Sequence, residues 1–159
     1  MTRVISVARE EKDGVVVIRR TLLDEVFGRV EQVLVVAKDR IVRRTWFDRH
    51  YSEVSLKRMK TRDGRDAVDV VWGHEGEGMS NWYWTIIVPP DPQQIEQLFS
   101  AVRDHETFEE IISYLHSNCL AKNVNRVAEC DIAVPGVRRV AASTLETLKE
   151  KEETVEESL

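Results

Sequence analysis

A glycine-rich stretch over residues 73–81 contains the side chains best suited to proton transfer. It reads Gly-His-Glu-Gly-Glu-Gly-Met-Ser-Asn, so His74 and Glu75 stand side by side among three glycines. A histidine oriented by a carboxylate can move a proton, and both types of side chain bind divalent metals. We therefore name His74 and Glu75 as catalytic candidates. The simpler interpretation, which we prefer, is an exposed hairpin loop whose glycines serve turn geometry, because the spacing matches no known metal-ligand pattern.

Histidine and cysteine supply one further set of metal-ligand types. His116 and Cys119 stand three apart on a predicted helix, with Cys130 on the next predicted strand and His105 upstream. Structural zinc sites normally take paired ligands from tight turns, and only the His116–Cys119 spacing resembles such a pair. We therefore expect Cys119 to pack in the core and the histidines to lie at the surface. The sequence predicts no metal and no cofactor.

Basic side chains concentrate in residues 38–65. This segment has ten Lys or Arg against four acids, a net charge of +6, whereas the whole chain has a net charge of −5. Basic groups can neutralise phosphates while aromatic rings, such as Tyr51, stack on unpaired bases, the usual combination for single-stranded nucleic acid. The residues that we name for such an interface are Arg40, Arg43, Arg44, Trp46, Lys57, Arg58 and Lys60. The alternative is a solvated or protein-facing surface, because alternate residues of amphipathic strands are expected to be polar.

Two further features bear on association with another chain. Trp82 and Trp84 share one face of a predicted strand and Tyr83 lies on the other, so this strand is either packed in the core or covered by a partner. A predicted helix over residues 137–148 has one apolar face and is followed by an acidic tail, which we expect to be solvated. A protein partner or a second copy is therefore an alternative to nucleic acid, and no membrane partner is expected.

Composition and missing motifs narrow the class of protein. Hydrophobic residues make up 42% and charged residues 32% of 159 residues, which is typical of one globular domain. Two cysteines are too few for a disulfide framework, and there is no long apolar segment, so we expect a cytoplasmic location. The sequence contains none of the phosphate-binding loops, nucleophile elbows or zinc-protease signatures of the common enzyme families.

The type of secondary structure predicted for these residues changes along the chain, from strands in the first half to helices in the second. The first half alternates in polarity, which predicts strands joined by short turns and therefore an antiparallel meander. The strands are predicted at residues 4–8, 15–18, 30–37, 40–47, 53–60, 67–73 and 81–88. Between the second and third, Thr21 to Gly28 is interpreted as a two-turn helix, with Thr21 as its cap, Asp24 completing a capping-box-like pair and Gly28 ending it; the alternative is a longer strand.

The second half has helical periodicity. Asp91, Pro92 and Gln94 predict a helix start, with a side-chain cap, a proline at the first position and a capping box. A second capping box is predicted from Thr107 to Glu110, and residues 126–134 are predicted to form one more strand.

Together these patterns predict an α+β fold, an antiparallel β-meander of six to eight strands in the first half with three to four helices mostly in the C-terminal half. Residues 1–148 are expected to form a single domain and residues 149–159 a charged tail. Three functions stay open: a non-enzymatic interaction module acting through protein or self association, an RNA or single-stranded DNA binder using the strands of residues 38–65, and an enzyme with its site near residues 73–81. The first is preferred because it needs the fewest special residues.

Overall fold

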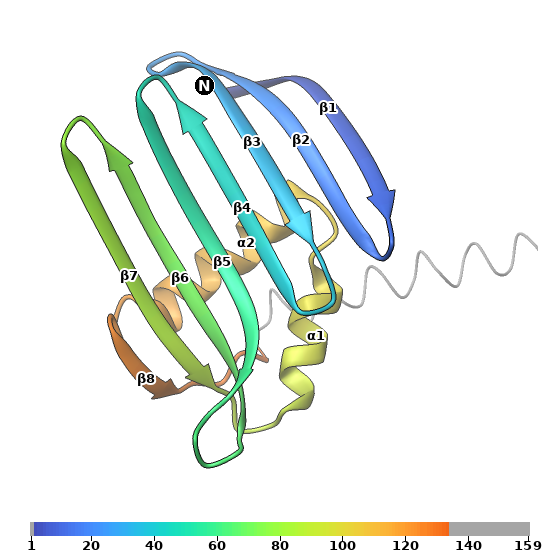
Figure 1. Ribbon diagram of the computed structural model, residues 1–159, viewed down its shortest axis with the longest axis vertical. Coiled ribbons are helices and arrows are strands. Elements are labelled where there is room, and N and C mark those ends of the chain that lie inside the picture. The colour runs from blue at the N-terminus through green and yellow to red at the C-terminus, as the bar shows by residue number, and fades with distance from the viewer. Residues whose placement is uncertain (1, 134–159) are drawn as a thin grey trace, which may run out of the picture.

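The computed structural model describes residues 2–133. One eight-stranded sheet dominates these residues, and its strands follow one another in space in chain order, as Figure 1 shows. Neighbouring strands from β1 to β7 are all antiparallel. The strands are β1 (Thr2–Lys12), β2 (Val15–Asp24), β3 (Gly28–Val36), β4 (Arg40–Phe47), β5 (His50–Lys60), β6 (Asp66–Gly76), β7 (Met79–Val88) and β8 (Arg126–Glu129). The predicted α+β fold and antiparallel meander are therefore confirmed.

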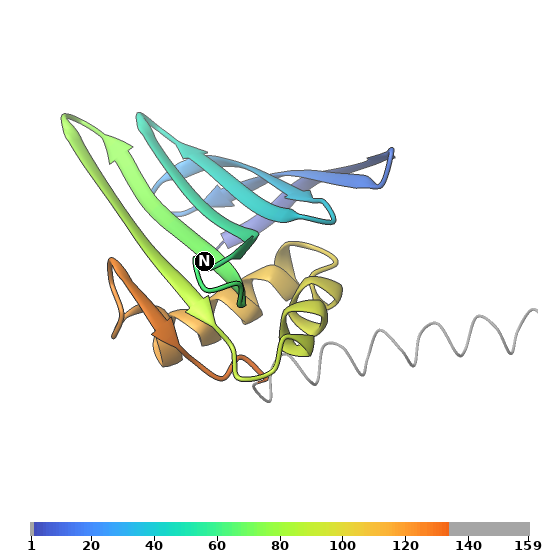
Figure 2. The same ribbon diagram turned by 60° about the horizontal axis from the view of Figure 1, so that its bottom comes forward.

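The helices form a second layer on one side of the sheet. They are α1 (Gln93–Ala101), α2 (His105–Leu115) and a short π-helical turn, η1 (His116–Leu120). Figures 1 and 2 show α1 and α2 on the same side of the strands. Alternate strand residues point toward them and form the core with the apolar faces of the helices, including Leu34, Ile41, Leu56, Leu98 and Phe108, each fully buried. We call this side of the sheet the helix face and the opposite side the open face.

The predicted helix from Thr21 to Gly28 is wrong. Those residues are the end of β2, a tight turn and the start of β3, and Leu22 pairs with Val30 across the two strands. The carboxylate of Asp24 accepts hydrogen bonds from the backbone N–H of Val26 (2.8 Å) and Phe27 (3.0 Å), which is an Asx turn. The same residue types that can cap a helix here close a hairpin, and Gly28 takes the left-handed conformation (φ 75°) at its end.

The glycine-rich segment is not a loop over its whole length. Strand β6 continues to Gly76, a two-residue turn follows at Glu77 and Gly78, and β7 starts at Met79. At two of the glycines, the missing side chain leaves room for the ring of a neighbouring residue. A Cβ at Gly73 would lie 2.3 Å from the indole of Trp82, and a Cβ at Gly76 would lie 2.3 Å from the imidazole of His50. Because a Cβ has no room at either position, these glycines let two rings lie flat on the sheet.

The predicted helix starts are displaced from the observed ones, because α1 has Pro92 and not Asp91 at its N-cap and α2 begins after Asp104 and not after Thr107. Asp91 accepts from the N–H of Gln93 (3.0 Å), whereas Gln94 is buried and accepts from the N–H of Ile132 (3.0 Å) instead of closing a box. The second box forms one turn earlier than predicted, between Asp104 and Thr107.

The last strand departs from the meander. Strand β8 is shorter than predicted and lies parallel to β7, so residues 89–125 form the crossover that a parallel pair requires. The predicted helix over residues 137–148 and the tail at residues 149–159 lie outside the described residues. Within residues 2–133, no helix is both long and apolar enough to cross a membrane.

Candidate functional site

Strand alternation divides the basic segment between the two faces of the sheet. Arg40 pairs with Lys57 and Arg44 with Glu53 across β4 and β5, so these four side chains share the open face. They surround a hollow of about 120 Å³, whose other lining residues are Val35, Val42 and Ser55. Ser55 and Val42 are buried and form its floor, while Arg40, Arg44 and Lys57 are exposed at its rim. Three cationic groups therefore converge on one small hollow.

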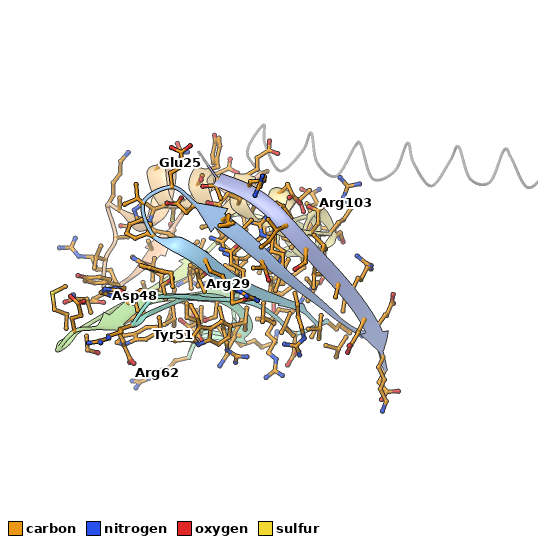
Figure 3. All side chains as sticks on the ribbon, turned by 90° about the horizontal axis from the view of Figure 1, so that it is seen from above. Glu25, Arg29, Asp48, Tyr51, Arg62 and Arg103 are labelled. Carbon is orange, nitrogen blue, oxygen red and sulfur yellow. The ribbon has the colours of Figure 1, made fainter. Side chains whose placement is uncertain are left out.

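An aromatic row lies beside this hollow, on the same face. The ring of Trp46 lies 5.5 Å from that of Tyr51, and Tyr51 lies 6.5 Å from Trp82, centroid to centroid. Trp46 is 41% exposed. Figure 3 shows Tyr51 on the side of the sheet away from the helices. The row crosses from β4 to β7 because cross-strand neighbours bring every second residue to the same face.

Polar contacts hold two rings of the row, those of Tyr51 and Trp82. The Tyr51 hydroxyl donates to Glu53 Oε1 (2.7 Å), to which Arg44 Nε also donates (3.3 Å). The Trp82 indole N–H donates to Glu75 Oε1 (3.0 Å) and its ring covers Gly73. Burial, together with the Glu53 carboxylate, raises the pKa of Tyr51 to about 12, so this ring stays a neutral phenol at physiological pH.

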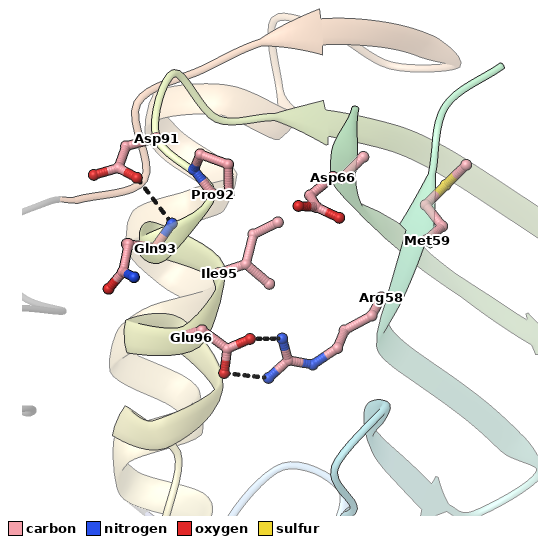
Figure 4. A pocket seen from close by; sticks show the side chains of 9 residues that line it. Arg58, Met59, Asp66, Asp91, Pro92, Gln93, Ile95 and Glu96 are labelled. Atoms are coloured by element: carbon pink, nitrogen blue, oxygen red, sulfur yellow. Dashed lines mark hydrogen bonds and ion pairs between the residues drawn. The ribbon is translucent and has the colours of Figure 1, made fainter. Parts of the chain in front are cut away.

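Three of the predicted interface residues lie elsewhere. Arg43 points to the helix face, pairs with Glu109 of α2 and lies over the Phe108 ring, 4.9 Å from its centroid. Arg58 pairs with Glu96 of α1 through two hydrogen bonds, as Figure 4 shows beside a pocket at the start of that helix. Lys60 pairs with Asp66 at the end of the β5–β6 hairpin (3.0 Å).

These pairings divide the predicted interface residues into two groups. Arg43 and Arg58 attach the helices to the sheet, and only the open-face group, Arg40, Arg44, Trp46 and Lys57, lies together. Period-two alternation places Arg43 and Arg44 on opposite faces, but it does not tell which face the helices cover. The sequence does not single out Trp82 or Ser55 for this face, because Trp82 suits core packing or a covering partner equally and Ser55 is a small residue without a motif.

The two catalytic candidates are separated by the same alternation. His74 lies on the helix face, where its Nε2 is 3.0 Å from His50 Nδ1 and the two rings stack. Glu75 lies on the open face and binds Trp82. Adjacent strand residues point to opposite sides of the sheet, so neither side chain can orient the other. The His50–His74 contact, continued by Phe47 at 5.2 Å from His50, is an aromatic stack at the hairpin end of the sheet.

The histidines and cysteines do not form a metal site in the part of the chain that the structure describes. No group of three or more metal-binding side chains gathers there. Cys119 is buried, as expected, and His116 is exposed against Trp72. His105 is the exception to the expectation of surface histidines, because it is 2% exposed and its Nε2 lies 2.9 Å from the Ile18 carbonyl oxygen.

The open face as a whole carries charges of both signs. Strands β2 to β7 contribute five cationic and four acidic side chains to it, namely Arg19, Arg29, Arg40, Arg44, Lys57, Glu31, Glu53, Asp69 and Glu75. Some are paired within the face, as Arg29 is with Glu31 (2.6 Å). A second, apolar groove of about 410 Å³ lies toward β7, lined by Asp69, Val71, Trp82, Tyr83, Trp84 and Ile86.

Comparisons with protein-family models, with curated proteins and with solved structures found no match to this chain.

Proposed function

We propose that this protein binds single-stranded nucleic acid on the open face of its sheet. One observation supports this proposal above the others: the three cations of β4 and β5 surround a small hollow beside the row Trp46–Tyr51–Trp82. Proteins that bind single strands combine a positively charged track for the backbone with aromatic rings for the bases. The open face holds both parts side by side.

Each part has a distinct task. In the hollow, Arg40, Arg44 and Lys57 would neutralise one phosphate, with the buried Ser55 hydroxyl at the floor as a further hydrogen-bond donor. Along the row, the exposed Trp46 and the half-buried Trp82 would stack with bases. Stacking of this kind is worth about 1–3 kcal/mol per base and tolerates any base. Binding is therefore expected to be weakly selective for sequence.

The number of phosphates that the cations around the hollow can neutralise determines how strongly salt should weaken nucleic-acid binding. Only three cations surround the hollow, and Glu53 lies among them. For single strands, log K falls with log salt at about −0.7 for each phosphate neutralised, so one phosphate held in the hollow gives a slope of about −0.7. Between 50 and 200 mM salt the affinity would then fall roughly two- to threefold. Such a shallow slope distinguishes this face from a strongly basic binding surface.

The test is a fluorescence-anisotropy titration of labelled single-stranded RNA and DNA oligonucleotides at several salt concentrations. The double variant Arg44→Gln/Lys57→Gln should lose about tenfold or more in affinity and flatten the salt slope. The matched control is Arg49→Gln/Arg62→Gln, which removes the same charge from two exposed positions outside the hollow. No binding by the wild type at low salt, or equal losses in the two double variants, would contradict the proposal.

A protein ligand is the second candidate. It is supported by the apolar groove beside Trp84, which is 39% exposed, and by the balanced charges of the open face. In-cell photo-crosslinking from position 84, with position 26 as an exposed control, tests it. Support requires that the crosslinked protein, once purified, binds the wild type and not Trp84→Glu. Equal crosslinking at both positions would exclude it.

A further inference from the structure

Strand β1 forms one edge of the sheet, and its exposure is unusual. It hydrogen-bonds to β2 alone among the described strands, and all eleven of its residues are exposed. Val4, Ile5 and Val7 are 46%, 47% and 61% exposed. The opposite edge, β8, has only four residues. A long edge with exposed β-branched side chains presents a row of backbone groups ready to pair with another strand.

Charges along β1 specify which strand fits. Its middle, Val4 to Ala8, has no charge, whereas Arg3 lies at one end and the charges of both signs of Arg9, Glu10, Glu11 and Lys12 lie at the other. A parallel copy would place Arg3 opposite Arg3 and acids opposite acids, which is destabilising. An antiparallel copy places each Arg3 opposite an acid. The charge pattern is therefore self-complementary only in the antiparallel direction.

The irregularity in β1 fixes the register. Pairing with β2 shifts between Val4 and Ser6, so Ile5 is an extra residue and Arg3 and Glu10 come to the same face of the strand, opposite Leu23 and Val17 of β2. A two-fold axis through Val7 then sets Arg3 against Glu10 of the second copy, twice per interface. It also sets Val7 against Val7 on the helix face.

We propose that two copies of this chain associate by antiparallel pairing of β1 with β1, which makes one continuous sheet across the dimer. Nine facing pairs, with Ile5 left over on each strand, give about eight to ten backbone hydrogen bonds, because alternate pairs exchange two each. That number is typical of a specific protein–protein interface. The inference uses the edge of the sheet and is independent of binding at the open face.

The test is sedimentation velocity of the full chain over a range of concentrations. The wild type should show a monomer–dimer equilibrium. Val7→Lys, which brings two ammonium groups together at the axis, should weaken it at least tenfold, whereas Val26→Lys, at a turn valine that is 82% exposed, should not. Arg3→Glu should weaken it similarly, and Arg3→Glu/Glu10→Arg should restore it, because the exchanged charges meet again across the axis.

A covalent probe reports the register directly. Val7→Cys should form an intermolecular disulfide under mild oxidation, and Val26→Cys should not. A wild type that stays monomeric at all concentrations overturns the inference. A dimer that neither Val7→Lys nor Arg3→Glu affects also overturns it, since association would then use another surface. Oligonucleotide binding is measured separately, so failure of one proposal does not decide the other.

Discussion

The buried contact of His105 fixes the tautomer of its neutral ring. A carbonyl oxygen can only accept, so Nε2 must carry the proton that is donated to Ile18, and the neutral ring then has a bare Nδ1. This Nδ1 is buried and has no hydrogen-bond partner. Protonation would place a charge and an unpaired N–H in the core, near Arg20 and Arg43. Burial accordingly lowers the pKa of His105.

The lowered pKa of His105 determines how the free energy of unfolding changes with pH. The unfolded chain, with a pKa near 6.5 for this group, binds the proton more readily than the folded chain. The free energy of unfolding should therefore be fully retained above pH 6.5 and fall below it, by at most about 1.4 kcal/mol per pH unit. His105→Gln should lose this part of the acid sensitivity, measured by urea denaturation from pH 5 to 7.5.

His116→Gln is the matched control, because His116 is an exposed histidine in the following turn. It should leave the acid sensitivity of the protein unchanged. Equal slopes for the wild type and His105→Gln would show that His105 takes up a proton as readily in the folded chain as in the unfolded one, which would contradict the lowered pKa.

At the scale of elements, the Arg58 side chain attaches α1 to the sheet through an ion pair and a cation–π contact. The Arg58 guanidinium donates twice to Glu96, lies 4.3 Å from the Phe99 ring centroid and donates from Nε to the Lys38 carbonyl (2.8 Å). Its side chain is 28% exposed, so the contacts are only partly screened by water. The planar guanidinium group can contact Glu96, Phe99 and the Lys38 carbonyl at the same time.

Arg58→Gln should therefore lower the free energy of unfolding by about 1–2 kcal/mol, through loss of the charge-assisted pair and the cation–π contact. Arg62→Gln, an exposed turn arginine in the same hairpin, should change it by less than about 0.5 kcal/mol. Urea denaturation measures both. If Arg58→Gln proved as mild as Arg62→Gln, the contacts with α1 would contribute nothing to stability.

The elements that sequence predicts best are those with one strong local signal. Strand β4 was predicted with its bounds correct, because alternation and the turn at Lys38–Asp39 agree. The segment Thr21–Gly28 failed because Asp24 and Gly28 suit a helix end and a hairpin turn equally. Only pairing of Leu22 with Val30, a contact made after folding, separates the two.

The candidate site was predictable in part for a related reason. Alternation places Arg40, Arg44 and Trp46 on one face of β4, and the sequence alone shows that. It does not show which face the helices cover, so Arg43 and Arg58 were counted as ligands although they pair with Glu109 and Glu96. The local sequence pattern does not show whether a charged residue forms an ion pair with a distant element.

At the scale of the whole molecule, the pairing of β8 with β7 differs from every other contact in the sheet. Strands β1 to β7 pair with their chain neighbours, whereas Thr85 pairs with Arg126. The core contact that follows β8 is Ile132, which is fully buried and tied to Gln94 of α1. Pairing of β8 with β7 and burial of Ile132 therefore require both helices to be in place.

The parallel strand therefore has a kinetic consequence. Hairpins close short loops and form early, while joining β8 to β7 must close a long one, so this corner is expected to become ordered after the rate-limiting step. Ile132→Ala should speed unfolding and leave the folding rate nearly unchanged, whereas Leu56→Ala, in the middle of the meander, should slow folding. Stopped-flow chevron plots compare the two; equal effects on the folding rate would mean that the sheet and its last strand are ordered in a single step.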